Sequence, residues 1–249
     1  MRVLLIVVAA LWGAGAGLLV PRAAHRLSVE AERPWRGDCP GGHPITGAFG
    51  GWVGRARCTG DEAGDCAAYG PSVPVVATVT ALVCAALAAA TGPRPEAAVW
   101  LSAAPAGVLL SLVDLRVHRL PDVLTLPLAA ALAVLLGVAA TLPAAGGSWP
   151  TALLGGLVLS AAYFVLFLVN PSGMGFGDVK LALALGAALG WYGWSVVVVG
   201  GLAGLLYGGC YGLGLVALRR AGRESAIPLG PFMLGGAFTG LLLGAAAAS

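Results

Sequence analysis

The sequence predicts an all-α, polytopic membrane protein. Of its 249 residues 59% are hydrophobic and only 10% are charged, and the mean hydropathy is +0.91. Such a chain is too apolar for a soluble globular domain. Apolar runs of about 18 to 22 residues recur along it, which is the length an α-helix needs to cross roughly 30 Å of hydrocarbon. We therefore expect about eight transmembrane helices, with a small cytoplasmic loop region after the first.

The predicted helices follow these apolar runs. They lie at about 3–20, 73–91, 97–113, 122–142, 150–169, 178–191, 194–217 and 227–247. The first run is longer than the usual core of a signal peptide and basic residues follow it, so a retained helix is favoured over a cleaved signal. The sixth run is short, and it ends at aromatic residues of a kind found at the membrane interface, so a partial crossing is left open for it.

The basic residues predict that the amino terminus lies outside the cytoplasm. This orientation places four segments on the inner side: 21–72, 114–121, 170–177 and 218–226. Most of the 14 basic residues then lie inside, namely Arg22, Arg26, Arg33, Arg36, Arg55, Arg57, Arg116, Arg119, Arg219, Arg220 and Arg223. Lys180 lies near that side, and only Arg2 and Arg94 fall outside, as the positive-inside rule requires. The net charge of +3 thus reports orientation, and no nucleic-acid partner is expected, because no basic stripe contains interleaved aromatic residues.

The chain divides into a first transmembrane helix (1–20), a polar cytoplasmic segment (21–72) and a membrane-embedded domain (73–249). About 50 polar residues can scarcely build a core without a metal or a neighbouring domain. Three cysteines lie in the polar segment, which is an odd number for a disulfide framework, and thiols in the cytoplasm stay reduced. A metal site or no role is therefore expected of these cysteines.

Three acidic residues lie at predicted helix ends in the membrane-embedded part, all on the inner side: Asp114 at the end of the third helix, Asp122 and Asp178. Ionisable groups at membrane depth are costly and usually functional. Two carboxylates held close together cannot both ionise comfortably, so they share a proton and supply both an acid and a base. One can then activate water for attack on a peptide bond while the other protonates the carbonyl oxygen and the leaving amine.

Glycines precede Asp178 at positions 173, 175 and 177. They remove side chains where an extended substrate would approach the acid, and they permit positive φ. A tight turn with Asp178 as a helix cap is the alternative interpretation of this stretch. For the acids as a set, the alternative is a proton-coupled transporter or ion relay. Their position near one face, without an internal repeat, weighs against transport.

Three motifs together carry a family resemblance. Asp114 and Asp122 are followed by LTLPL (residues 124–128), residues 173–181 read GMGFGDVKL, and residues 227–232 read IPLGPF. These stretches closely resemble the type IV prepilin peptidases, the prepilin leader peptidase family of GxGD-type aspartic proteases. The resemblance spans residues from about 100 to 247.

The resemblance implies a bacterial membrane hydrolase with Asp114 and Asp178 as its catalytic pair. It implies supporting roles for Asp122 and for Lys180, which would tune Asp178 or hold its helix end, and for Gly175 and Gly177. The expected activity is removal of the short basic leader from type IV prepilin or pseudopilin precursors at the cytoplasmic face of the inner membrane, in pilus assembly or protein secretion. The expected partners are these precursors and the lipid bilayer, and the oligomeric state is not predicted.

Many members of this family also methylate the new amino terminus with S-adenosylmethionine, using a region with two CxxC pairs. This chain instead has Cys39 and His43, followed by Cys58 and Cys66. These four residues can supply zinc ligands, although their spacing fits no usual finger or ribbon. Zinc binding by these residues is therefore left open. No cofactor is expected to be required for proteolysis. The altered cysteine pattern argues against methyl transfer with S-adenosylmethionine.

Overall fold

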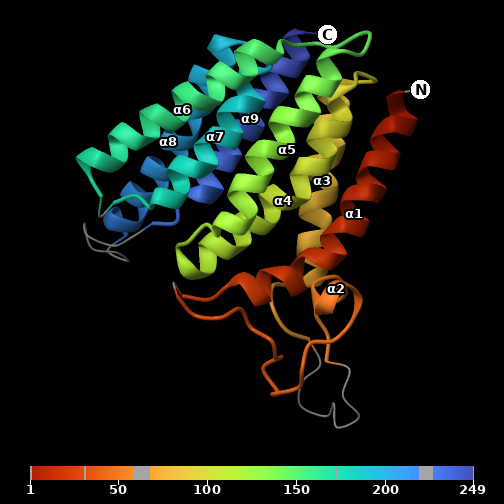
Figure 1. Cartoon of the computed structure of the whole chain (residues 1–249), viewed down its shortest axis with the longest axis vertical. Helices are drawn as coiled ribbons and strands as arrows, with labels where there is room; N and C mark the ends of the chain where they lie inside the picture. Colours follow the sequence, from red (N-terminus) through yellow and green to blue (C-terminus); the bar gives the residue numbers. More distant parts are fainter. Residues whose placement is uncertain (1, 31, 59–67, 172, 219–226, 249) are drawn as a thin grey trace.

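The structure is a computed structural model that describes all residues except 1, 31, 59–67, 172, 219–226 and 249. The described residues form nine helices and no strand apart from one isolated bridge between Asp38 and Pro44. Eight long helices stand side by side in a bundle, with residues 32–58 beneath one end of it (Figure 1). This arrangement confirms the predicted all-α, polytopic fold.

The helices are α1 (Arg2–Leu27), α2 (Ala48–Gly51), α3 (Val73–Thr91), α4 (Glu96–Val117), α5 (Asp122–Ala140), α6 (Trp149–Val169), α7 (Phe176–Gly190), α8 (Trp194–Ala217) and α9 (Gly230–Ala247). Seven of them are long and apolar enough to cross a membrane, and α2 and α7 are not among these. The predicted sixth crossing corresponds to α7. With 15 residues it is about 22 Å long, shorter than a hydrocarbon core of roughly 30 Å.

Helix α7 is the central helix of the bundle. It packs against α5, α6, α8 and α9, and most of its residues are buried. Its close contact with α6 depends on small residues, since a Cβ added at Gly155 of α6 would lie 2.7 Å from the carbonyl oxygen of Gly186. Small residues at a membrane helix interface let two backbones approach closely. Asp178 in the first turn of α7 is thereby held inside the bundle.

Helix α1 packs mainly along α3 and continues through Pro21 to Leu27, past the predicted end at residue 20. Arg22 lies in this continuation and is buried. Its guanidinium donates hydrogen bonds to the carbonyl oxygens of Arg55 (3.1 Å) and Thr46 (3.1 Å). The loops of the polar segment are thus fastened to the end of α1.

The start of α1 and the end of α9 lie at one end of the bundle, and the α4–α5 loop and the start of α7 lie at the other (Figure 1). The described parts of 21–72, 114–121 and 170–177, which were predicted to share one side of the membrane, therefore lie at one end. A hydrogen bond from Arg119 to the carbonyl oxygen of Glu30 (3.1 Å) joins the α4–α5 loop to the polar segment there. The predicted inner-side residues Arg219, Arg220 and Arg223 lie outside the described residues.

A buried ion pair closes the opposite end of the bundle. Glu96, at the start of α4, has no exposed surface and lies 3.7 Å from Arg94. The backbone N–H of Gly146 donates to both carboxylate oxygens of Glu96 (3.1 and 3.3 Å), and Arg94 donates to the carbonyl oxygen of Ala245 in α9 (2.7 Å). The prediction of only three acids at helix ends in the membrane-embedded part is wrong, because Glu96 is a fourth. Its partner Gly146 is distant in sequence.

We expect Glu96→Ala to destabilise the fold by about 3 kcal/mol, because it leaves the Arg94 guanidinium buried and unpaired. Thermal unfolding of the purified protein in detergent measures this loss. The matched control is Glu30→Ala, which removes the exposed pair with Arg33 and should change stability by less than about 0.5 kcal/mol. Equal melting temperatures for the two variants would contradict a structural role for the buried pair.

Candidate active site

Asp178 lies in the first turn of α7 and is 6% exposed. One of its carboxylate oxygens, Oδ2, accepts the backbone N–H of Gly175 (3.0 Å), and its own N–H donates to the carbonyl oxygen of Gly175 (3.0 Å). This reciprocal pattern matches a capping box, in which an acid at the third helical position satisfies the N–H of the residue before the helix. Asp178 therefore does cap α7, as the alternative interpretation expected, and the cap uses one of its two carboxylate oxygens.

Gly177, directly before Asp178, permits a close contact. A Cβ added at Gly177 would lie 2.9 Å from the Cβ of Leu120, so the absence of a side chain lets the α4–α5 loop touch α7. The positive φ that glycine permits is not used at Gly175 or Gly177, and Gly175 is extended with φ −79°. The contact at Gly177 brings the end of α4 towards Asp178.

Asp114 lies in the last turn of α4 and is 4% exposed. It does not end the helix as predicted, because α4 continues to Val117. Its Oδ2 accepts the backbone N–H of Gly230 at the start of α9 (2.9 Å), and a Cβ added at Gly230 would lie 2.8 Å from that oxygen. Gly230 therefore belongs to the candidate site, although it was not among the predicted site residues. The available signal was its place in the quoted IPLGPF motif.

The two carboxylates are oriented in the same way. Each accepts a backbone N–H from a glycine at or just before a helix start, and each does so through Oδ2. Within the described part of the chain, the other oxygen of each has no protein hydrogen-bond partner. An arrangement of two buried acids, each with one unengaged oxygen, can bind a water and exchange protons with a substrate.

Asp122 lies apart from this pair, at the first residue of α5, with a side chain that is 59% exposed. Its Oδ2 accepts a hydrogen bond from Lys180 Nζ at 2.6 Å. Lys180 Nζ also lies 5.1 Å from the centre of the Phe176 ring. These contacts tie the start of α5 to the first turns of α7. Of the two roles expected for Lys180, they favour holding the helix end.

Three of the four predicted zinc ligands converge in the polar segment. Cys39 Sγ lies 3.6 Å from His43 Nδ1 and 2.8 Å from Cys58 Sγ, and Cys58 Sγ lies 3.7 Å from His43 Nδ1. The backbone N–H of Cys39 donates to the carbonyl oxygen of His43 (2.9 Å), which places both side chains on one side of a tight loop. The fourth predicted ligand, Cys66, lies outside the described residues.

This donor set fits zinc in chemistry and nearly in geometry. Tetrahedral zinc separates sulfur and nitrogen donors by about 3.5 Å and two sulfurs by about 3.7 Å. The two sulfur–nitrogen distances match, and the two thiols would move apart by about 1 Å. The three side chains are among those that line a cavity of about 10 Å³, which is room for roughly one small ion or water.

Comparison with known proteins gives a consistent family assignment. The type IV leader peptidase family model matches residues 101–243, a range that contains Asp114, Asp178 and Gly230. The prepilin leader peptidase/N-methyltransferase of Aeromonas hydrophila is 33% identical over 254 residues, covering 88% of this chain and 84% of the relative. The protein of that name from Pseudomonas aeruginosa is 33% identical over 231 residues, covering 90% of this chain and 70% of the relative. No solved structure matches the chain significantly. With more than half of its length matched by the family model, this chain belongs to the type IV leader peptidase family.

Proposed function

We propose that this protein is a membrane aspartic endopeptidase that removes the basic leader from type IV prepilin-like precursors, with Asp114 and Asp178 as its catalytic pair. One observation carries the proposal: two buried carboxylates lie at one end of the helix bundle, and each accepts a hydrogen bond from a glycine N–H. The chain that forms this bundle belongs to the type IV leader peptidase family. The comparisons give no support to the alternative, a proton-coupled transporter or ion relay.

The two carboxylates supply the acid and the base of peptide hydrolysis. The ionised member takes a proton from water as the water oxygen attacks the carbonyl carbon of the scissile bond, and the protonated member donates to the carbonyl oxygen. When the tetrahedral intermediate collapses, the C–N bond breaks and a proton passes to the leaving amine. The hydrogen bonds from Gly175 and Gly230 hold the carboxylates in place throughout, so the pair is preorganised for the reaction.

We assign the peptidase to residues 73–249 and its active site to the cytoplasmic face of the inner membrane. The support for this orientation is the excess of arginines in the loops at the Asp114 end of the bundle. Prepilin or pseudopilin precursors are the proposed substrates, by analogy with the printed names of the relatives.

We further propose that Cys39, His43 and Cys58, with Cys66 as a fourth ligand, bind a structural zinc ion. The zinc ion would cross-link the polar segment (21–72), which is too small to form a hydrophobic core of its own. The ion takes no part in the proteolytic steps. The printed names of the relatives also include N-methyltransferase, but the cysteine pattern here differs from two CxxC pairs, so our proposal is restricted to proteolysis.

Asp114→Asn and Asp178→Asn should each lower the cleavage rate by about 100-fold or more, because each removes one half of the acid–base pair. The rate is measured by the mobility shift of a co-reconstituted precursor. Asp122→Asn is the matched control and should retain most activity, since Asp122 is exposed and paired with Lys180. Near-normal processing by either pair variant, in protein with an unchanged melting temperature, would refute the assignment.

Lys180→Asp should lower cleavage about two- to fivefold, because it places two acids where α5 meets α7. The double variant Asp122→Lys/Lys180→Asp restores opposite charges and should recover most of the loss. Lys180→Met distinguishes the two roles expected for this lysine. If Lys180 only holds the helix end, the pH profile of the cleavage rate is unchanged in this variant. If Lys180 tunes Asp178, the pH profile shifts along the pH axis.

Elemental analysis of the purified protein should find about one zinc ion per chain, and Cys58→Ser should lose most of it. Cys210→Ser is the matched control, because Cys210 is an exposed cysteine in α8. We expect zinc loss to lower the melting temperature while cleavage by the aspartate pair persists. Equal zinc content in both variants would contradict the site.

A further inference from the structure

Tyr163 of α6 is a buried tyrosine that the proposed mechanism does not use. It is 2% exposed and belongs to a hydrophobic cluster that also contains Leu120 and Val179. Leu120 is the residue that contacts Gly177, and Val179 directly follows Asp178. Tyr163 therefore packs among the residues that surround the first turn of α7.

The register of α6 against α7 gives the same position. In the middle of the interface, a Cβ added at Gly155 would lie 2.7 Å from the carbonyl oxygen of Gly186. Further along α6, the Ser160 hydroxyl donates a hydrogen bond to the carbonyl oxygen of Val179 (2.9 Å), so the two helices are antiparallel. Tyr163 lies about 4.5 Å beyond Ser160 along the axis of α6. It is therefore at the level of the first turn of α7, which carries one of the two acids.

The Tyr163 hydroxyl makes no hydrogen bond to any residue that the structure describes. A buried tyrosine hydroxyl usually has a partner. At Asp178 the Oδ2 atom is engaged by the N–H of Gly175, and the Oδ1 atom is left for another partner. A hydroxyl and a carboxylate oxygen at the same level, each without a protein partner, can share one water molecule.

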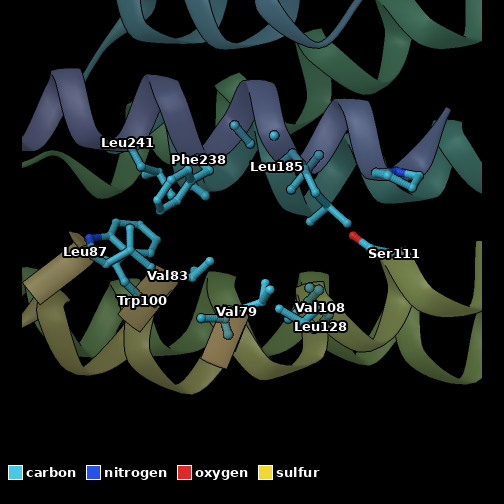
Figure 2. A pocket seen from close by; sticks show the side chains of 18 of the residues that line it. Val79, Val83, Leu87, Trp100, Val108, Ser111, Leu128, Leu185, Phe238 and Leu241 are labelled. Atoms are coloured by element: carbon cyan, nitrogen blue, oxygen red, sulfur yellow. The ribbon is translucent and has the colours of Figure 1, made fainter. Parts of the chain in front are cut away.

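The interior of the bundle next to α4 offers such a water few partners. A cavity of about 410 Å³ lies there, lined from α3, α4, α5, α7 and α9. Figure 2 shows Ser111 and Trp100, the two polar side chains of its lining, at opposite ends, with the apolar Leu185 of α7 between them. Ser111 lies on α4, one turn before Asp114, so its hydroxyl is placed beside the other acid. On the α6 side, by contrast, the Tyr163 hydroxyl is available.

We propose that the attacking water lies between Asp178 Oδ1 and the Tyr163 hydroxyl oxygen, each of which accepts a hydrogen bond from it. This inference rests on the proposed function. With both of its hydrogens held, the water can direct a lone pair at the carbonyl carbon of the scissile bond. The new C–O bond forms as Asp178 takes one proton from the water, and Asp114 donates its proton to the carbonyl oxygen. Tyr163 is thus a third catalytic residue, which orients the water and transfers no proton.

Tyr163→Phe tests the proposal, because it removes the hydroxyl and keeps the ring that packs between α6 and α7. We expect kcat for a co-reconstituted precursor to fall about tenfold, because the water loses one of its two acceptors. KM should stay within about twofold, because the contacts that bind the precursor are unchanged. Cleavage kinetics of the full-length protein in liposomes, expressed per folded protein, measure both constants.

Two variants are the matched controls. Tyr207→Phe removes a hydroxyl of α8 that is hydrogen-bonded to Thr239 (3.1 Å), and it should leave kcat unchanged. Ser160→Ala removes the hydrogen bond between α6 and α7 and so reports what a loosened interface does to kcat. Wild-type kcat in Tyr163→Phe, or an equal loss of kcat in Ser160→Ala, would overturn the role of Tyr163.

The wild-type protein separates the two proposals. If it does not cleave the precursor, the proposed function is refuted and this inference with it. If it cleaves the precursor and Tyr163→Phe does so equally fast, only the role of Tyr163 is refuted, and the aspartate pair stands.

Discussion

Asp178, in the first turn of the short helix α7, is buried in the bundle, and most of the active-site geometry follows from that constraint. The backbone N–H groups of a first helical turn have no partner within the helix. The Asp178 carboxylate supplies one by turning back to Gly175. The α4–α5 loop covers the same turn because Gly177 leaves room for Leu120. The cap at Gly175 thus orients one acid, and the contact at Gly177 holds the α4–α5 loop, which follows the helix of the second acid, against the same turn.

Both acids are oriented by the same kind of hydrogen bond. Asp178 and Asp114 each accept an N–H from a glycine at or just before a helix start, one in α7 and one in α9. At Gly230 the absence of a side chain is what permits the contact, because a Cβ would collide with the carboxylate. Each acid is consequently oriented by backbone rather than by a mobile side chain. Orientation by backbone lowers the reorganisation needed during proton transfer, which is the main way that buried polar sites assist chemistry.

Much of this arrangement could be predicted from sequence, because it depends on local signals. The apolar runs predicted the spans, and the arginine distribution placed Asp114, Asp122 and Asp178 at one end. What sequence could not predict depends on contacts between distant residues. Glu96 is buried because Gly146 and Arg94 pack around it, and Gly230 matters because α9 begins beside α4. Gly177 matters in the same way, because it leaves space for Leu120 of the α4–α5 loop.

Helix α9 makes a polar contact near each of its ends with a residue in or next to α4. At one end the N–H of Gly230 contacts Asp114, and near the other the carbonyl oxygen of Ala245 accepts a hydrogen bond from Arg94. An α-helix is stiff along its axis, so sliding of α9 by one residue, about 1.5 Å, would break both contacts together. The two faces of the membrane are therefore mechanically linked. Damage to the Arg94 contact on one face would be transmitted along α9 to the orientation of Asp114 on the other.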